Sequence, residues 1–192
     1  MPPHVGHSYL ISFASRFCSQ HNEKLYVLVC TLDDEPIDGQ LRYDWVRRMA
    51  PEVEVIHVTE RIPEAQRGRE GATRLWAEAV AKRVDEPVTH VFASERYGQD
   101  LAGELGATFV PVDPSRSMFP VSASRIRANS FQEWRFVPGI VRYWFLKRIA
   151  VIDLPPEGHL HLAETLAERL GTAHSGDYLS FLERSRLQGT VP

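Results

Sequence analysis

The chain has 192 residues, of which 43% are hydrophobic and 24% charged, and its formal net charge is -3 at pH 7. This length buries one main core plus an extension, and the charge lacks the basic excess typical of nucleic-acid-binding proteins. No apolar run approaches the roughly 18 residues of a membrane span, and the first residues do not resemble a signal peptide. We therefore expect a cytoplasmic protein that binds neither nucleic acid nor membrane, with Cys18 and Cys30 reduced.

Short β-branched runs alternate with longer helical patterns from the start of the chain. Strands are predicted at 25–30, 53–58, 88–93 and 108–112, and helices at 8–21, 41–49, 73–84 and 99–105. Such alternation is typical of βαβ units, and near-continuous apolar strands favour a parallel sheet with helices on both faces. The sequence therefore predicts an α/β, Rossmann-like fold with an open parallel sheet.

A turn-rich stretch at 113–120 is followed by a helical pattern that begins at Ser122, and then by an aromatic-dense region up to Phe145 that we assign to core packing. From Lys147 the β/α pattern restarts, with a strand at 148–152, a helix to about Leu170 and a last helical piece at 177–187. We divide the chain into a domain at 1–146 and a smaller segment at 147–192.

Two histidines flank a glycine directly before the first predicted helix, in the order His4, Val5, Gly6, His7. Unpaired backbone N–H groups and the positive end of the helix dipole gather at such a position. Imidazoles donate hydrogen bonds to phosphate oxygens, and a glycine lets a ligand approach the backbone closely. A short histidine pattern also arises by chance, so by itself this segment indicates phosphate binding only.

A second anion-binding pattern lies at 121–127, where Ser122, Ser124 and Arg127 combine two hydroxyls with a guanidinium at a helix start. Taken alone, Ser122 would be an ordinary helix cap and Arg127 a surface charge. With both segments in this order, the chain resembles the nucleotidyltransferase superfamily that has HxGH and [IV]SxTxxR-like motifs. Ser124 stands where threonine is common, and the hydroxyl is kept.

Further stretches narrow the resemblance to the adenylyltransferase domain of the NadR family. Similar segments lie at 76–80, 91–95, 113–116, 131–134 and 137–138. The resemblance implies that the chain joins nicotinamide mononucleotide to the AMP part of ATP, giving NAD and pyrophosphate. It also implies that ligands bind at the carboxyl ends of the strands.

The resemblance implies a role for each candidate residue. His4, His7 and Arg127 are the expected catalytic residues, and Gly6, Ser122, Ser124 and Arg127 are expected to bind ATP. The expected contacts to the second substrate are Trp76, Ser94, Glu95 and Arg116, although a tryptophan on a helix is more often core and Arg116 suits a surface salt bridge. Mg²⁺ is expected to arrive with the ATP phosphates, and no dedicated metal site is predicted.

The chain departs from the family pattern at two places. Family members have a strand and a Gly-x-Phe segment before the first motif, where this sequence has only Met1 to Pro3, so the first strand of the sheet is missing and apolar edges should be exposed. The segment at 152–160 aligns with a kinase phosphate loop but has no lysine, no hydroxyl after Gly158 and two prolines. We therefore interpret 147–192 as a degenerate, truncated kinase remnant.

Two other functions stay open. One is a nucleotidyltransferase of the same superfamily with another acceptor, and the other is a catalytically weak or inactive nucleotide-binding relic. The sequence also leaves open whether the chain forms a homo-oligomer, and whether the amide or the acid form of the mononucleotide is preferred.

Overall fold

The computed structural model describes residues 1–31, 35–59, 72–146, 165 and 169. The chain divides into two compact units, Met1–Arg142 and Tyr143–Pro192. All candidate site residues belong to the first unit. The elements predicted after Lys147 fall outside the described residues, apart from Thr165 and Arg169, which are helical.

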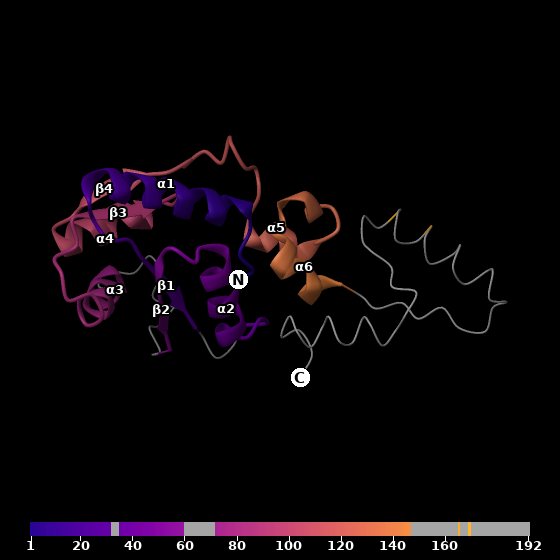
Figure 1. Cartoon of the computed structure of the whole chain (residues 1–192), viewed down its shortest axis with the longest axis horizontal. Coiled ribbons are helices and arrows are strands. Elements are labelled where there is room, and N and C mark those ends of the chain that lie inside the picture. The colour runs from indigo at the N-terminus through magenta and orange to yellow at the C-terminus, as the bar shows by residue number, and fades with distance from the viewer. Residues whose placement is uncertain (32–34, 60–71, 147–164, 166–168, 170–192) are drawn as a thin grey trace. The chain divides into compact units, whose positions relative to one another are not determined.

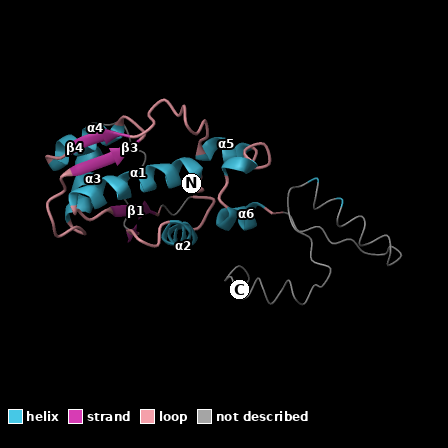
Figure 2. Cartoon of the chain, turned by 45° about the horizontal axis from the view of Figure 1, so that its top comes forward, coloured by secondary structure: helices cyan, strands magenta, loops and turns pink. Residues whose placement is uncertain are grey.

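Helices and parallel strands alternate along the first unit, which confirms the α/β class (Figures 1 and 2). The elements are α1 (Val5–His21), β1 (Tyr26–Cys30), α2 (Gly39–Met49), β2 (Glu54–Val58), α3 (Ala72–Ala81), β3 (His90–Ala93), α4 (Tyr97–Leu105), β4 (Thr108–Pro111), α5 (Ala123–Ala128), a 3-10 turn (Trp134–Phe136) and α6 (Gly139–Phe145). The apolar runs and helical periods before residue 147 thus lie where they were expected, with no end shifted by more than three residues.

The strands form two separate parallel pairs. In the first, β1 pairs with β2 so that Tyr26 lies opposite Glu54, and in the second, β3 pairs with β4 so that His90 lies opposite Thr108. No strand among the described residues joins β1 to β3.

The helix α1 packs against both pairs of strands. Ile11 joins a core cluster with Val29 of β1 and Val46 of α2, while Phe17 lies 5.3 Å from the ring of Phe92 on β3. In Figure 1, α1 accordingly runs beside both sheets. Because α1 is held on two sides, its first turn has a defined place relative to the ends of the strands.

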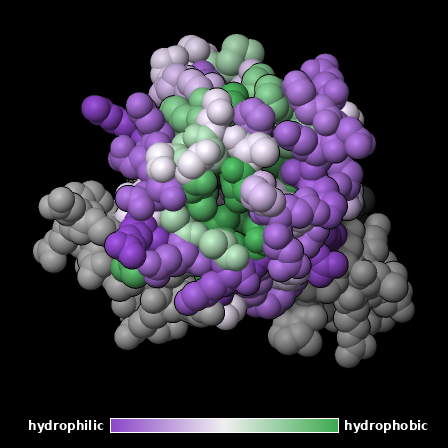
Figure 3. Space-filling view, turned by 90° about the vertical axis from the view of Figure 1, so that its left-hand side faces the viewer, coloured by the Kyte–Doolittle hydropathy of each residue, from purple (hydrophilic) through white to green (hydrophobic). Residues whose placement is uncertain are grey.

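Both β1 and β3 are less buried than the strands of a parallel sheet usually are. Each has one buried residue, Val29 in β1 and Ala93 in β3, and the other positions are half-buried. Figure 3 shows apolar surface in the middle of one face of the described residues, surrounded by polar side chains.

The second strand pair is covered closely by α4. A Cβ atom at Gly98 would lie 2.6 Å from the Cβ of Ala93 and 2.7 Å from the ring of Phe109. Glycine is therefore required there for α4 to approach β3 and β4, and this approach places the β3 to α4 connection. None of the described helices combines the length and apolar character needed to cross a membrane.

Candidate functional site

His4 and His7 lie at the start of α1. The helix begins at Val5, three residues earlier than predicted, so Gly6 and His7 belong to its first turn and do not precede it. The reason is local: His4 is extended (φ -143°), and its backbone N–H donates to Nδ1 of His7 over 3.1 Å. Since Nδ1 accepts, a neutral His7 has its proton on Nε2 and can donate from there.

The two imidazoles are in contact and are poorly solvated. Their ring centroids are 3.8 Å apart, His4 is only 9% exposed, and Nδ1 of His4 is buried with no hydrogen-bond partner among the described residues. A buried polar atom without a partner is costly, and ligand binding is one way in which such an atom becomes paired. The pair thus has one free donor position on His7 and one unpaired nitrogen on His4.

Both histidines are neutral at pH 7. Burial, with smaller contributions from His7 and Arg116, lowers the pKa of His4 to about 3. Burial also lowers the pKa of His7 to about 4. The charges of the N-terminal amino group and Arg116 lower this pKa by smaller amounts. These imidazoles therefore offer hydrogen bonds without a positive charge of their own.

Gly6 faces the ring of His4. A Cβ at Gly6 would lie 3.0 Å from both Cε1 and Nδ1 of His4 and 3.9 Å from Cβ of Phe119. A side chain at this position would therefore press on the imidazole. This packing is a second reason for glycine here, in addition to the ligand approach inferred from the sequence.

The second motif contacts the N-terminal residue of the chain. Arg127 of α5 donates to Oγ of Ser124 over 3.4 Å, and its guanidinium also contacts the side chain of Met1, 126 positions away in the sequence. Ser122 caps α5 by accepting from the backbone N–H of Arg125 over 3.2 Å. The structure therefore places Arg127 against Met1, three positions before His4, while the hydroxyl of Ser122 already serves the helix.

Arg116 and Glu95 also lie next to each other. Nη2 of Arg116 donates to Oε1 of Glu95 over 3.0 Å, and Nη1 donates to the carbonyl of Val121 over 3.4 Å. The charge of Arg116 acts on both His4 and His7. Two of the four predicted contacts to the second substrate are thus joined near the histidine pair.

The other two predicted contacts have different surroundings. Ser94 is half-buried and directly follows β3, next to Glu95. Trp76 of α3 packs against the core cluster that contains Val58 and Ala79. Core packing is the role that the sequence analysis favoured for Trp76.

One charged residue near the site was not singled out from the sequence. Arg42 of α2 is only 7% exposed and forms an ion pair with Glu35, which also lies 3.3 Å from the N-terminal amino group. Nε of Arg42 has no hydrogen-bond partner among the described residues. Three arginines occur in this helix, and sequence periodicity alone does not show which of them is buried.

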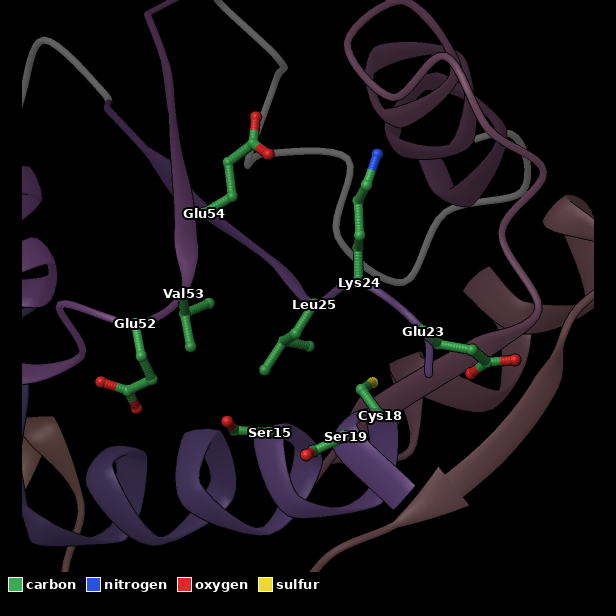
Figure 4. Close-up of a pocket in the computed structure, with 9 residues that line it drawn as sticks. All are labelled: Ser15, Cys18, Ser19, Glu23, Lys24, Leu25, Glu52, Val53 and Glu54. Atoms are coloured by element: carbon green, nitrogen blue, oxygen red, sulfur yellow. The ribbon is translucent and has the colours of Figure 1, made fainter. Parts of the chain in front are cut away.

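A pocket of about 480 Å³ lies away from these residues. It is lined by side chains from α1 and from the starts of β1 and β2, among them Ser15, Cys18, Leu25 and Val53 (Figure 4). None of the predicted site residues lines it. Burial raises the pKa of the Cys18 thiol, and the nearby charge of Glu23 raises it further. Neither Cys18 nor Cys30 forms a disulfide bond.

The donors at the candidate site suit an anion. They are the neutral imidazoles of His4 and His7, the hydroxyl of Ser124 and the guanidinium groups of Arg116 and Arg127. In the part of the chain that the structure describes, no three His, Cys, Asp or Glu side chains cluster closely enough to hold a metal ion. Such donors are appropriate for phosphate oxygens.

No protein-family model matches the chain. It is similar to the trifunctional NAD biosynthesis/regulator protein NadR of Escherichia coli (strain K12), with 24% identity over 193 residues, and to the protein of the same name from Salmonella typhimurium, with 24% identity over 195 residues. Each alignment covers 92% of this chain and 46% of the relative, so the chain spans about half the length of the curated relatives it matches. The chain is therefore distantly similar to NadR.

Proposed function

We propose that this chain is an adenylyltransferase that joins nicotinamide mononucleotide to the adenylyl group of ATP, giving NAD and pyrophosphate. The observation that supports the proposal is the set of anion donors near the start of α1. His4 and His7 are in contact there, the charge of Arg116 acts on both, and Arg127 contacts Met1, three positions before His4. The distant similarity to proteins named for NAD biosynthesis agrees with this assignment.

In the proposed reaction, a phosphate oxygen of nicotinamide mononucleotide attacks the α-phosphorus of ATP. A new oxygen–phosphorus bond forms, the bond between the α-phosphorus and the bridging oxygen breaks, and pyrophosphate leaves. No covalent bond to the protein is needed, so the protein contributes positioning and charge stabilisation.

Each group at the site has a distinct part in that stabilisation. His7 donates from Nε2, and the unpaired Nδ1 of His4 donates to a phosphate oxygen when it carries the hydrogen of the neutral imidazole. Arg127 neutralises charge on the leaving pyrophosphate, assisted by Ser124 and Ser122. In this proposal ATP binds at His4, His7, Ser122, Ser124 and Arg127. The phosphate of nicotinamide mononucleotide binds at Arg116.

Mg²⁺ is proposed to bind together with ATP. The site residues are nitrogen donors and hydroxyls, and such groups fit a Mg²⁺ ion that is held by phosphate and water oxygens. Bound in this way, the ion spreads the charge of the triphosphate. The protein residues then have to orient the α-phosphate and the attacking oxygen.

The test is a panel of acceptors incubated with the purified chain, ATP and Mg²⁺, with released pyrophosphate and formed dinucleotide measured together. We expect nicotinamide mononucleotide or its acid form to give stoichiometric pyrophosphate and dinucleotide. Phosphopantetheine with ATP, and an alcohol phosphate with CTP, are the controls for other acceptor classes. Preference for either control would show that the chain has a different substrate.

The second candidate is a nucleotide-binding protein without turnover. Two observations favour it: the strands are divided into two pairs, and the side chain of Met1 contacts Arg127 in the candidate site. This candidate predicts that ATP or nicotinamide mononucleotide raises the thermal midpoint of unfolding while no pyrophosphate is released. Release of pyrophosphate at enzyme-like rates would exclude it.

A further inference from the structure

The loop between β4 and α5 holds Arg116 in a defined position. The carboxylate of Asp113 accepts hydrogen bonds from the backbone N–H groups of Ser117, Met118 and Phe119, over 2.8 to 3.3 Å. Desolvation raises the pKa of Asp113, but these hydrogen bonds outweigh it and hold the pKa below its usual value. The loop is therefore organised around an ionised carboxylate.

Two residues of this loop have left-handed backbones, Asp113 at φ 46° and Arg116 at φ 52°. A non-glycine residue adopts this conformation only where the surrounding contacts compensate for it. The carbonyl of Val121 also accepts from Nη1 of Arg116. The guanidinium is thus oriented by its own loop, independently of Glu95.

Glu95 is held much less firmly. It follows β3 in an exposed turn, and its side chain is 59% exposed, against 42% for Arg116. An ion pair between exposed side chains contributes little stability, because water and salt screen it. The Glu95 carboxylate can therefore leave Arg116 at small cost, whereas Arg116 stays in place.

We propose that the Glu95 carboxylate occupies the position of a ligand phosphate on Arg116 and is displaced when a nucleotide ligand binds. The Glu95 carboxylate accepts from Nη2 of Arg116, and a phosphate oxygen that binds at the same N–H group has to replace it. Glu95 then sets the affinity for phosphate by competition and is not a contact to the ligand. This inference rests on the proposed function for the location of the site.

The test measures binding of inorganic phosphate by calorimetry, without ATP or nicotinamide mononucleotide, at low ionic strength. We expect Glu95→Gln to bind inorganic phosphate roughly two- to fivefold more tightly than the unchanged chain, the range given by an exposed ion pair. The gain should shrink as salt is added. Glu104→Gln, the same charge change at an exposed position of α4, should give no comparable gain.

A double-mutant cycle connects the effect to Arg116. In an Arg116→Gln background, we expect Glu95→Gln to change the affinity no more than Glu104→Gln does. Equal or weaker binding by Glu95→Gln, or a gain that persists without Arg116, would overturn the inference. Circular dichroism verifies that each variant is folded.

The two proposals fail in different ways. A chain that makes no dinucleotide but shows the expected affinity pattern would contradict the proposed reaction and support displacement of Glu95. A chain that makes NAD while Glu95→Gln binds inorganic phosphate no more tightly would contradict the displacement alone.

Discussion

At the scale of single residues, the candidate site combines neutral histidines with arginines. His4 and His7 are kept uncharged by burial, and Arg116 and Arg127 provide the positive charge. This separation of roles suits a reaction in which negative charge moves from one phosphate to another. It also means that each of these side chains can be tested separately.

We predict that His7→Ala and Arg127→Ala each lower turnover of the proposed reaction by about 10²–10³-fold, the usual effect of removing one donor to a developing charge. The steady-state rate of pyrophosphate release measures this. His21→Ala at the other end of α1 and the exposed Arg74→Ala are matched controls and should keep nearly full turnover. Near-normal turnover in His7→Ala or Arg127→Ala would contradict the mechanism.

The lowered histidine pKa values predict a dependence of stability on pH. Because the unfolded chain binds protons near pH 6.5 while folded His4 and His7 bind them only near pH 3 to 4, stability is fully present above pH 6.5 and falls as the pH drops. The loss should approach about 1.4 kcal/mol per pH unit for each histidine. Urea unfolding between pH 7 and 5.5 measures it.

The control for this dependence is the double variant His4→Gln/His7→Gln. Glutamine has no titrating group, so the stability of the variant should vary less between pH 7 and 5.5 than that of the unchanged chain. An identical slope in both proteins would show that other groups are responsible.

At the scale of elements, the close approach of α4 to β3 and β4 determines where Ser94 and Glu95 lie. Ala93 of β3 and Phe109 of β4 both touch the backbone at Gly98, and the connection that holds Ser94 and Glu95 begins right after Ala93. A displacement of α4 would therefore also move Glu95 relative to Arg116.

We predict that Gly98→Ala destabilises the chain by about 1–3 kcal/mol, because the new methyl group overpacks the contact with Ala93 and Phe109. Gly103→Ala in the same helix meets no atom within 4 Å and should stabilise by up to about 1 kcal/mol. Urea unfolding of both variants measures these two changes in the free energy of unfolding. Equal effects at the two positions would refute the packing argument.

At the scale of the whole molecule, the first unit contains all the predicted site residues, and the curated relatives extend well beyond the length of this chain. The interpretation of 147–192 as a kinase remnant lies outside the described residues and stays a prediction. It rests on the missing lysine and hydroxyl and on the two prolines at 155 and 156.

We predict that the purified chain does not transfer phosphate from ATP to nicotinamide riboside, because the segment at 152–160 lacks the groups that hold a triphosphate and Mg²⁺. Chromatographic detection of nicotinamide mononucleotide after incubation measures this, with an authentic kinase as the positive control. Formation of the mononucleotide would show that the remnant interpretation is wrong.

Much of the fold was predictable because the signals are local. Apolar runs predicted the four strands, and Gly106, which is left-handed at φ 67°, ends α4 as its type suggests. The start of α1 was predicted three residues too late, because the contact between His7 and the His4 backbone only exists once the helix has formed. Element ends depend on such contacts and are therefore harder to predict.

What the sequence by itself determined is the α/β class and the presence of two sequence patterns, His4 to His7 and Ser122 to Arg127, since residue type and spacing define both. Only the tertiary structure decided that Arg127 contacts Met1, that Arg116 pairs with Glu95, and that Arg42 is buried. These contacts join residues far apart in the sequence. They follow from how helices and strands pack together, and local periodicity contains no information about that packing.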